Sequence, residues 1–334
     1  MFINGFFENN QSFIKITNKD NFEVVLSSIG ASIYSIKLDN ILLTQTHISK
    51  ELHKKGYLGK TIGRVANRIA GNKILIEGIE YKLKNNEGPN TLHGGSDGLS
   101  YKDFSYQIEQ SQDYINVIFS YFSPNLESGF PGNVYFKITY SVSKKSNSLK
   151  ITFEADTDKT TPCSLTNHTF FTLGEKSLSN LSLRIDSSKC IFPNPADLLA
   201  NHIGKVNDSL DFRKPKTITK DINDKDLQNS RTKGYDHYYF FDKIDKDINQ
   251  IELLSKNYIL KINTDFEGVQ IYTDNYESEY EFYDLPTNKI NRAIAIEPSS
   301  PHNKLHLLNK KKHYYHTINY TFERLCYERH QRIR

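Results

Sequence analysis

One glutamate of this sequence is placed where it could take a proton from a ligand. Glu297 ends the segment 292–297, in which two isoleucines alternate with two alanines. Alternate residues of a strand point to opposite faces, so Glu297 shares its face with the alanines, which leave room for a ligand above the sheet. Pro298 follows and is expected to end the strand. We interpret Glu297 as a candidate general base.

One histidine could both give and take a proton near neutral pH. His168 lies between Asn167 and Thr169 and precedes two phenylalanines, so we expect it at the edge of an aromatic-lined pocket. A core histidine hydrogen-bonded to the backbone would produce the same pattern. Asn167 adds a second polar group to an otherwise apolar run, and this favours a functional histidine.

Two polar segments near the start of the chain suit a ligand that carries several hydroxyls. The first ends in Asn67 and Arg68, which place an amide beside a rigid fork of donors. Such a pair can hold vicinal sugar hydroxyls, whereas a structural arginine paired to a buried carboxylate is the alternative. Arg64 is expected to be structural. In the second segment His93 precedes two glycines, which allow a ligand to approach closely; a loop histidine without function is the alternative.

Two further polar residues lie in later strand-like segments. Asp236 stands in a tyrosine-rich run, where a carboxylate is costly to bury unless it is paired or binds a ligand. A charge on an edge strand that faces water would explain it equally. Gln270 lies between Val269 and Ile271, so its face is polar while the opposite face is apolar, as at Glu297.

The strands that must position these residues are indicated by alternation with a period of two. Apolar and polar residues alternate in segments 115–119, 134–142, 149–153, 181–185, 258–262, 269–271 and 294–296. Many short strands separated by turns predict an all-β fold, a large antiparallel β-sandwich, which we assign to a single domain over residues 1–334.

The segments between the strands carry fewer signals. Residues 221–230 could form one short helix or a polar loop, and residues 205–232 are expected to be a long surface excursion. The basic tail after Glu323 is expected to be a solvated end.

Composition argues against several classes of protein. The net charge is +4 and the basic residues form no stripe along the chain, so nucleic acid is not expected as a partner. No run approaches ~18 apolar residues, and the first ten residues lack the pattern of a signal peptide, so neither a membrane nor secretion is expected. Three widely separated cysteines (163, 190 and 326) favour free thiols and a cytoplasmic location. Histidines 302–316 and the acidic run at 245–249 lack credible metal spacing, so no metal is expected.

Taken together, the segments resemble the aldose 1-epimerase (galactose mutarotase) family over nearly the whole chain. Six motifs match in order and approximate spacing: Ala66-Asn67-Arg68, Leu92–Gly95, Asn167–Phe171, Tyr235-Asp236-His237, Gly268–Thr273 and the strand that ends at Glu297. The resemblance implies the large twisted β-sandwich of the galactose mutarotase type, the supersandwich. It also implies that His168 is the general acid on the ring oxygen and Glu297 the general base on the C1 hydroxyl. The substrate contacts that it implies are Asn67, Arg68, His93, Asp236 and Gln270.

The reaction implied by the resemblance is the interconversion of the α and β anomers of free aldohexoses, galactose or glucose, by ring opening and reclosure. It needs no cofactor, and its partner is a small monosaccharide bound by a monomer or homodimer. The segment Pro298–Asn303 and the absence of Trp depart from the family pattern and leave the preferred sugar open. The alternatives are a hexose-phosphate epimerase, a non-catalytic carbohydrate-binding β-sandwich, and a glycoside-cleaving enzyme with Asp236 and Glu297 flanking the bond.

Overall fold

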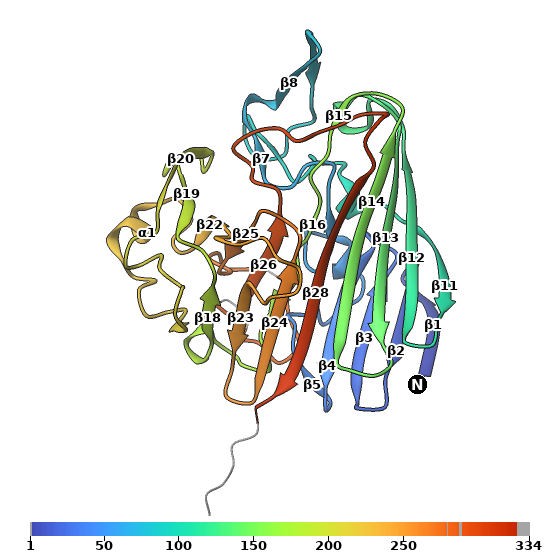
Figure 1. Ribbon diagram of the computed structural model, residues 1–334, viewed down its shortest axis with the longest axis vertical. Coiled ribbons are helices and arrows are strands. Elements are labelled where there is room, and N and C mark those ends of the chain that lie inside the picture. The colour runs from blue at the N-terminus through green and yellow to red at the C-terminus, as the bar shows by residue number, and fades with distance from the viewer. Residues whose placement is uncertain (1, 279, 287–288, 326–334) are drawn as a thin grey trace, which may run out of the picture.

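The largest sheet runs through the whole molecule and is completed by the last strand of the chain (Figure 1). The computed structural model describes residues 2–278, 280–286 and 289–325. The nine strands, all paired antiparallel, follow in the order β11 (Ser105–Gln110), β12 (Tyr114–Ser123), β13 (Val134–Ser143), β14 (Ser148–Thr157), β28 (Tyr314–Arg324), β24 (Tyr258–Thr264), β23 (Ile251–Leu254), β18 (Ser182–Ile185) and β21 (Lys216–Thr217). Strand β28 therefore lies between strands β11–β14, which come earlier in the chain, and strands β18, β21, β23 and β24, which follow them.

Two further sheets complete the layers. The N-terminal sheet consists of β1 (Phe2–Glu8), β2 (Gln11–Thr17), β3 (Phe22–Ser27), β4 (Ser32–Leu38) and β5 (Ile41–Leu42) in sequence order. The six-stranded sheet has the order β17 (Phe170–Phe171), β26 (Ile294–Ser299), β25 (Gly268–Tyr272), β22 (Asp236–Phe240), β19 (Lys189–Pro193) and β20 (Ala200–Lys205). One buried apolar cluster draws on all three sheets, so they pack as layers around a common core.

Short pairs of strands support the loops. They are β6 (Thr61–Ile62) with β16 (Thr166–Asn167), β7 (Arg68–Ile69) with β10 (Thr91–Leu92), β8 (Lys73–Ile76) with β9 (Ile79–Lys82), and β15 (Thr161–Pro162) with β27 (Leu307–Leu308). The helix α1 (Lys225–Asn229) begins after Asp224, whose side chain accepts a hydrogen bond from the backbone N–H of Asp226.

The alternation of β25 and β26 separates the core from the opposite face of the six-stranded sheet. Val269, Ile271, Ile294 and Ile296 belong to the common core. Gln270 and Glu297 lie opposite each other across the two strands, on the other face. The predicted all-β sandwich and the predicted strands are therefore confirmed.

Two expectations about the strand that carries Glu297 are corrected. Strand β26 does not end at Glu297 but continues through Pro298 to Ser299. A proline is tolerated there because the backbone pairing with β17 covers only Ile294 and Ala295, so no strand ladder on that side requires an N–H at position 298. The two alanines of this face are not bare, since Ala293 and Ala295 are covered by Leu58 and Phe170.

The segment 205–232 is not merely a surface excursion. Leu210, Phe212, Ile218 and Leu227 are buried in the common core, because isolated apolar residues in a polar run anchor it to the sheets. Of the two alternatives for residues 221–230, a short helix or a polar loop, the structure shows the helix, α1.

The predicted solvated tail and the predicted free thiols are only partly covered by the described residues. Arg324 is not free, because its guanidinium donates to Asp39. Cys163 and Cys190 are free, as expected, and both are buried. Cys326 and the remainder of the tail lie outside the described residues. Among the described residues no helix is long and apolar enough to cross a membrane.

Candidate functional site

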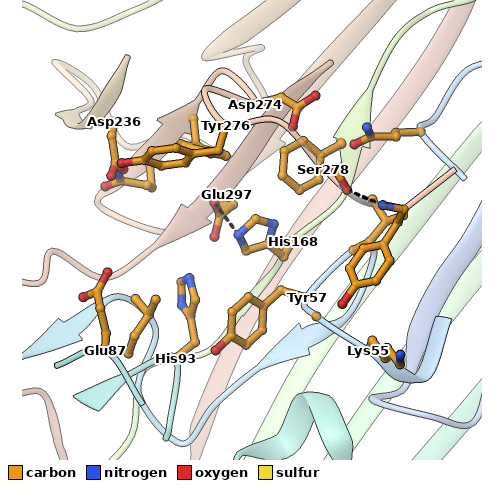
Figure 2. A pocket seen from close by; sticks show the side chains of 18 of the residues that line it. Lys55, Tyr57, Glu87, His93, His168, Asp236, Asp274, Tyr276, Ser278 and Glu297 are labelled. Atoms are coloured by element: carbon orange, nitrogen blue, oxygen red, sulfur yellow. Dashed lines mark hydrogen bonds and ion pairs between the residues drawn. The ribbon is translucent and has the colours of Figure 1, made fainter. Parts of the chain in front are cut away.

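The predicted acid and base face each other inside one cavity. Glu297 comes from β26, and His168 directly follows β16. Their side chains are almost fully buried, and the His168 Nε2 lies 3.4 Å from a Glu297 carboxylate oxygen. Both line a cavity of about 740 Å³, in which they occupy the middle (Figure 2). Two groups that could exchange protons are therefore held within reach of one ligand atom.

His93 and Tyr57 cover the pair from the side of the loops (Figure 2). His93 has φ 54°, and its Nδ1 accepts a hydrogen bond of 3.1 Å from the backbone N–H of Asn67. A neutral ring with Nδ1 as acceptor carries its proton on Nε2. The ring of His93 lies edge-on to that of His168 at 5.3 Å, and Tyr57 lies edge-on to His93 at 4.8 Å. His93 can therefore offer an Nε2–H donor close to the acid–base pair.

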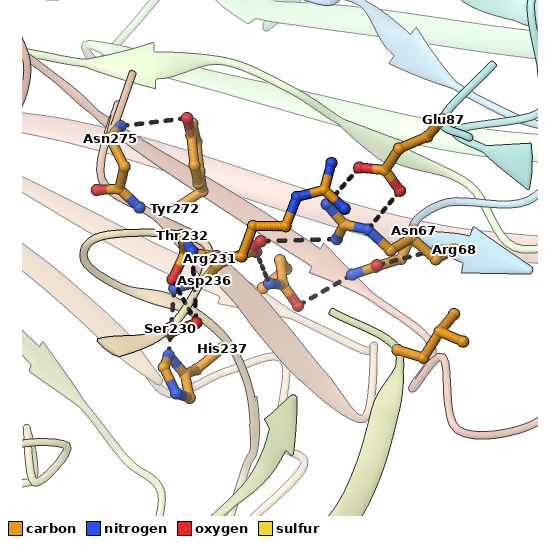
Figure 3. A network of polar contacts seen from close by, with 12 residues as sticks. Asn67, Arg68, Glu87, Ser230, Arg231, Thr232, Asp236, His237, Tyr272 and Asn275 are labelled. Atoms are coloured by element: carbon orange, nitrogen blue, oxygen red, sulfur yellow. Dashed lines mark hydrogen bonds and ion pairs between the residues drawn. The ribbon is translucent and has the colours of Figure 1, made fainter. Parts of the chain in front are cut away.

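A continuous polar network forms one end of the cavity (Figure 3). The Asn67 amide donates to Gln270 Oε1 at 3.1 Å, and the Gln270 amide donates to Asp236 Oδ1 at 2.5 Å. The Arg68 Nη1 lies 3.6 Å from Asp236 Oδ2, while its Nε and Nη2 donate to Glu87 at 2.8 and 3.0 Å. All five residues line the cavity. Their remaining donors and acceptors suit vicinal hydroxyls.

The structure bears on the alternatives left open for three of these residues. Arg64 is structural, as expected, because its guanidinium donates to Ser123 and to the carbonyl of Pro131 in a buried position away from the cavity. Arg68 is paired to carboxylates and also lines the cavity, so the two interpretations are not exclusive. Asp236 is not an edge charge facing water, since β22 lies between β19 and β25.

Burial controls the electrostatics of the site. It raises the pKa of Glu297 well above its ordinary value, and the nearby Asp236 carboxylate adds to the effect. Burial lowers the pKa of His168 to about 4. Burial also lowers the pKa of His93 well below its ordinary value. Burial therefore disfavours charge on both members of the acid–base pair and favours a neutral carboxyl beside a neutral imidazole.

One group of side chains has the chemistry to hold a metal ion. Single ligand atoms of His93, His168 and Glu297 lie within 4.8 Å of one another, and this is the only such group of three among the described residues. Sequence spacing could not suggest it, because the three residues are far apart in the chain. The histidine-rich segment is used differently: His306 contacts the carbonyl of Pro301.

Several residues of the cavity were missed by reasoning from the sequence. Tyr57, Glu87, Arg231 and Tyr276 all line it but lie in loops without a pattern. For Glu87 alone the sequence held an indirect indication. If Arg68 was structural it needed a buried carboxylate as its partner, and Glu87 is such a partner. The seven residues predicted for the site are all brought to this one cavity: Asn67, Arg68, His93, His168, Asp236, Gln270 and Glu297.

Comparisons with a family model and with known proteins point to the same family. The family model described as aldose 1-epimerase matches residues 12–321. The chain is 33% identical over 276 residues to an aldose 1-epimerase of Haemophilus influenzae, covering 79% of this chain and 78% of that protein. It is 25% identical over 325 residues to a maltose epimerase of Levilactobacillus brevis, covering 92% and 94%.

The fold agrees with this assignment. The solved structure of a galactose 1-epimerase from Lactobacillus acidophilus matches with a TM-score of 0.87 at 23% identity, covering 97% of this chain and 99% of that one. This likeness supports the supersandwich fold predicted from the sequence. The family model and the Haemophilus influenzae relative together show that the chain belongs to the aldose 1-epimerase family of isomerases.

Proposed function

We propose that this protein interconverts the α and β anomers of free aldohexoses, with Glu297 and His168 as its acid–base pair. The observation that carries the proposal is the 3.4 Å approach of His168 Nε2 to Glu297 within the cavity. C1 of a pyranose bears both the hydroxyl that must lose a proton and the ring oxygen that must gain one. Two proton-exchanging groups this close can serve both oxygens at once.

In the forward direction Glu297 takes the proton of the C1 hydroxyl while His168 protonates the ring oxygen. The C1–O5 bond breaks, C1 becomes an aldehyde carbonyl, and rotation about C1–C2 exposes its other face. Reclosure reverses both proton transfers. Because the substrate supplies its own electrophile, the reaction needs no further reactant.

The Glu297–His168 pair carries the same number of protons before and after ring opening, and again before and after reclosure. A C1 hydroxyl that donates to Glu297 favours its ionised form, and the displaced proton can pass to His168. The pair then stands as carboxylate and imidazolium, ready for ring opening. The ring-opened state leaves the proton on Glu297, which is the arrangement that burial favours in the free protein.

The remaining predicted residues bind and orient the sugar. Asp236 accepts a hydrogen bond from one sugar hydroxyl, and Arg68 donates to another. Asn67 and Gln270 hold the Asp236 and Arg68 side chains in place through the polar network. The Nε2–H of His93 can support negative charge as it moves between O1 and O5.

Polarimetry on freshly dissolved α-D-glucose and α-D-galactose tests the proposal. The wild-type protein is expected to speed the approach to equilibrium, and Glu297→Gln is expected to lower the rate by roughly 10²-fold or more, because the amide has the same size but cannot accept the proton. A folded variant that retained more than about a tenth of the wild-type rate would overturn the role of Glu297.

A further inference from the structure

The proposed acid of the pair lacks the support that catalytic histidines usually have. A catalytic histidine is commonly oriented by a hydrogen bond at the ring nitrogen that does not react. In His168 that nitrogen is Nδ1, which is buried and makes no hydrogen bond to another described residue. A contact with its own backbone remains, but it cannot tie the ring to a neighbouring element. Some other feature must therefore hold Nε2 toward Glu297.

Aromatic rings surround the His168 ring where a hydrogen-bond partner is missing. The centre of the Phe170 ring lies 5.0 Å from that of His168, with 35° between the ring planes. The Tyr57 ring lies at 6.0 Å with 26° between the planes, and the His93 ring lies edge-on at 5.3 Å. Figure 2 shows Tyr57 beside both histidines at the wall of the cavity. Because protein interiors are close-packed, rings this near leave the imidazole little room to turn.

The backbone anchors the segment of Tyr57 to that of His168, although the two are far apart in the sequence. The N–H of Gly59 donates to the carbonyl of His168 at 2.9 Å, and the N–H of His168 donates to the carbonyl of Lys60 at 2.9 Å. These two hydrogen bonds begin two residues after Tyr57. The Tyr57 side chain is therefore what remains to be fixed relative to the imidazole.

Asn86 fixes the Tyr57 side chain from a neighbouring loop. Its Nδ2 donates to the Tyr57 hydroxyl at 2.9 Å. The same amide donates to the carbonyl of Leu92 at 2.9 Å and accepts from the N–H of Leu92 at 2.7 Å, so it is itself held at both ends. The Tyr57 hydroxyl also interacts with Tyr101. Burial raises the pKa of Tyr57, so its hydroxyl stays a neutral phenol that takes no part in proton transfer.

We propose that Tyr57, held by Asn86, is the positioning residue of the acid His168. This rests on the proposed function, because it concerns the acid of that reaction. The Tyr57 ring keeps the imidazole turned so that its Nε2 faces Glu297 and the ring oxygen of the sugar. An aromatic neighbour suits this task better than a carboxylate, because a carboxylate at Nδ1 would stabilise the imidazolium and make it a weaker acid.

Steady-state polarimetry on glucose and galactose tests this role. Tyr57→Ala is expected to lower kcat by roughly 30- to 100-fold and to change KM by less than about threefold, because a turned imidazole slows the proton transfer while the polar network still binds the sugar. Tyr57→Phe and Asn86→Ala both remove the bond between hydroxyl and amide but keep the ring, so each should lower kcat by roughly three- to tenfold. The double variant Tyr57→Phe/Asn86→Ala should be no worse than the more affected single variant, because both changes break one bond.

Asn85→Ala is the matched control. Asn85 is exposed like Asn86 and does not line the cavity, and its Nδ2 donates to the carbonyl of Gly88 within the same loop at 2.8 Å. Its loss should leave kcat unchanged within about twofold. If Tyr57→Ala does not fold, Tyr57→Phe and Asn86→Ala carry the test, because the first keeps the ring and the second changes an exposed residue.

The outcomes separate the possible failures. A Tyr57 variant with raised KM and unchanged kcat would make Tyr57 a stacking surface for the sugar and overturn its positioning role. Additive losses in the double variant, or equal losses in Asn85→Ala and Asn86→Ala, would overturn the link through Asn86. An active wild-type protein with unaffected variants would overturn the positioning role alone. An inactive wild-type protein would remove the proposed function and the positioning role together.

Discussion

The acid–base pair is the feature on which the chemistry depends. In the proposed mechanism Glu297 and His168 share one proton, and burial shifts their pKa values in opposite directions. The pair is competent when it carries that single proton, whichever member holds it. Its activity should therefore be lost both when a second proton is added and when the only one is removed.

The rate should accordingly follow a bell-shaped pH profile. Addition of a second proton requires His168 to be protonated beside protonated Glu297, so the rate falls as the pH decreases through about 4, the pKa of His168. Loss of the only proton is governed by the raised pKa of Glu297, so the rate falls again as the pH rises through that pKa. Initial mutarotation rates, corrected for the reaction without protein, would measure both limbs. An acidic limb near pH 6.5, the ordinary pKa of a histidine, would contradict the assignment.

Substitutions should separate acid catalysis from binding. His168→Ala is expected to lower kcat with little change in KM, because proton transfer to the ring oxygen acts in the transition state. Arg68→Ala and Asp236→Ala should also raise KM, because contacts to hydroxyls exist in both states. Polarimetry at several sugar concentrations would give both constants. A His168 variant that changed only in KM would contradict this division of roles.

At the scale of elements, the site depends on the register of β25 and β26 and on the loops around β7 and β10. The register brings Gln270 opposite Glu297, and the close approach of Gly94 to the backbone of Gly63 fixes the turn next to His93. A Cβ built on Gly94 would lie 1.9 Å from the Gly63 carbonyl oxygen. Position 94 therefore has no room for a side chain.

Gly94→Ala should consequently reduce both stability and activity. Gly78 is a matched control, because it also has positive φ but has nothing within 4 Å of the position of a Cβ. Gly78→Ala should cost only the strain of a left-handed residue, about 1–2 kcal/mol, with activity retained. Gly94→Ala should cost more and displace His93. Thermal unfolding and mutarotation rates of both variants would decide; equal behaviour would contradict the steric argument.

The elements also show what the sequence could and could not predict. Alternation in β12, β13 and β25 was strong enough to identify both the strands and their buried faces, because one face of each is apolar. The residues of the cavity were found where their neighbours were informative, as at Glu297. Tyr57 could not be found, because it lies in a loop and reaches the site only through tertiary packing.

At the scale of the whole molecule, strands differ in importance according to their place in the sheets. β28 lies between β14 and β24, whereas β1 is the edge strand of the N-terminal sheet and exposes Phe2 and Phe7. Loss of β28 would leave two long strand edges unpaired, and loss of β1 would expose only β2.

Truncation should reveal this difference. A protein that lacks residues 1–9 is expected to fold and retain activity, while one that lacks residues 314–334 should be insoluble or inactive. Circular dichroism and size-exclusion chromatography would measure folding, and polarimetry the activity. A soluble, active protein without β28 would contradict the role given to this strand.

The polar network has a consequence for stereochemistry. The backbone N–H of Arg68 donates to Asn67 Oδ1, Asn67 donates to Gln270, and Gln270 donates to Asp236, so each hydrogen bond in this chain points the same way. The orientation of both amides is thereby fixed. Asp236 is left only to accept and Arg68 only to donate, so one hydroxyl of the sugar must give its proton where its neighbour must receive one. Because a hydroxyl can do either, these two contacts alone would not sense handedness, but together with a C1 centre held at the proposed acid–base pair they would fix three points of the sugar, which is enough to distinguish it from its enantiomer before any bond is broken.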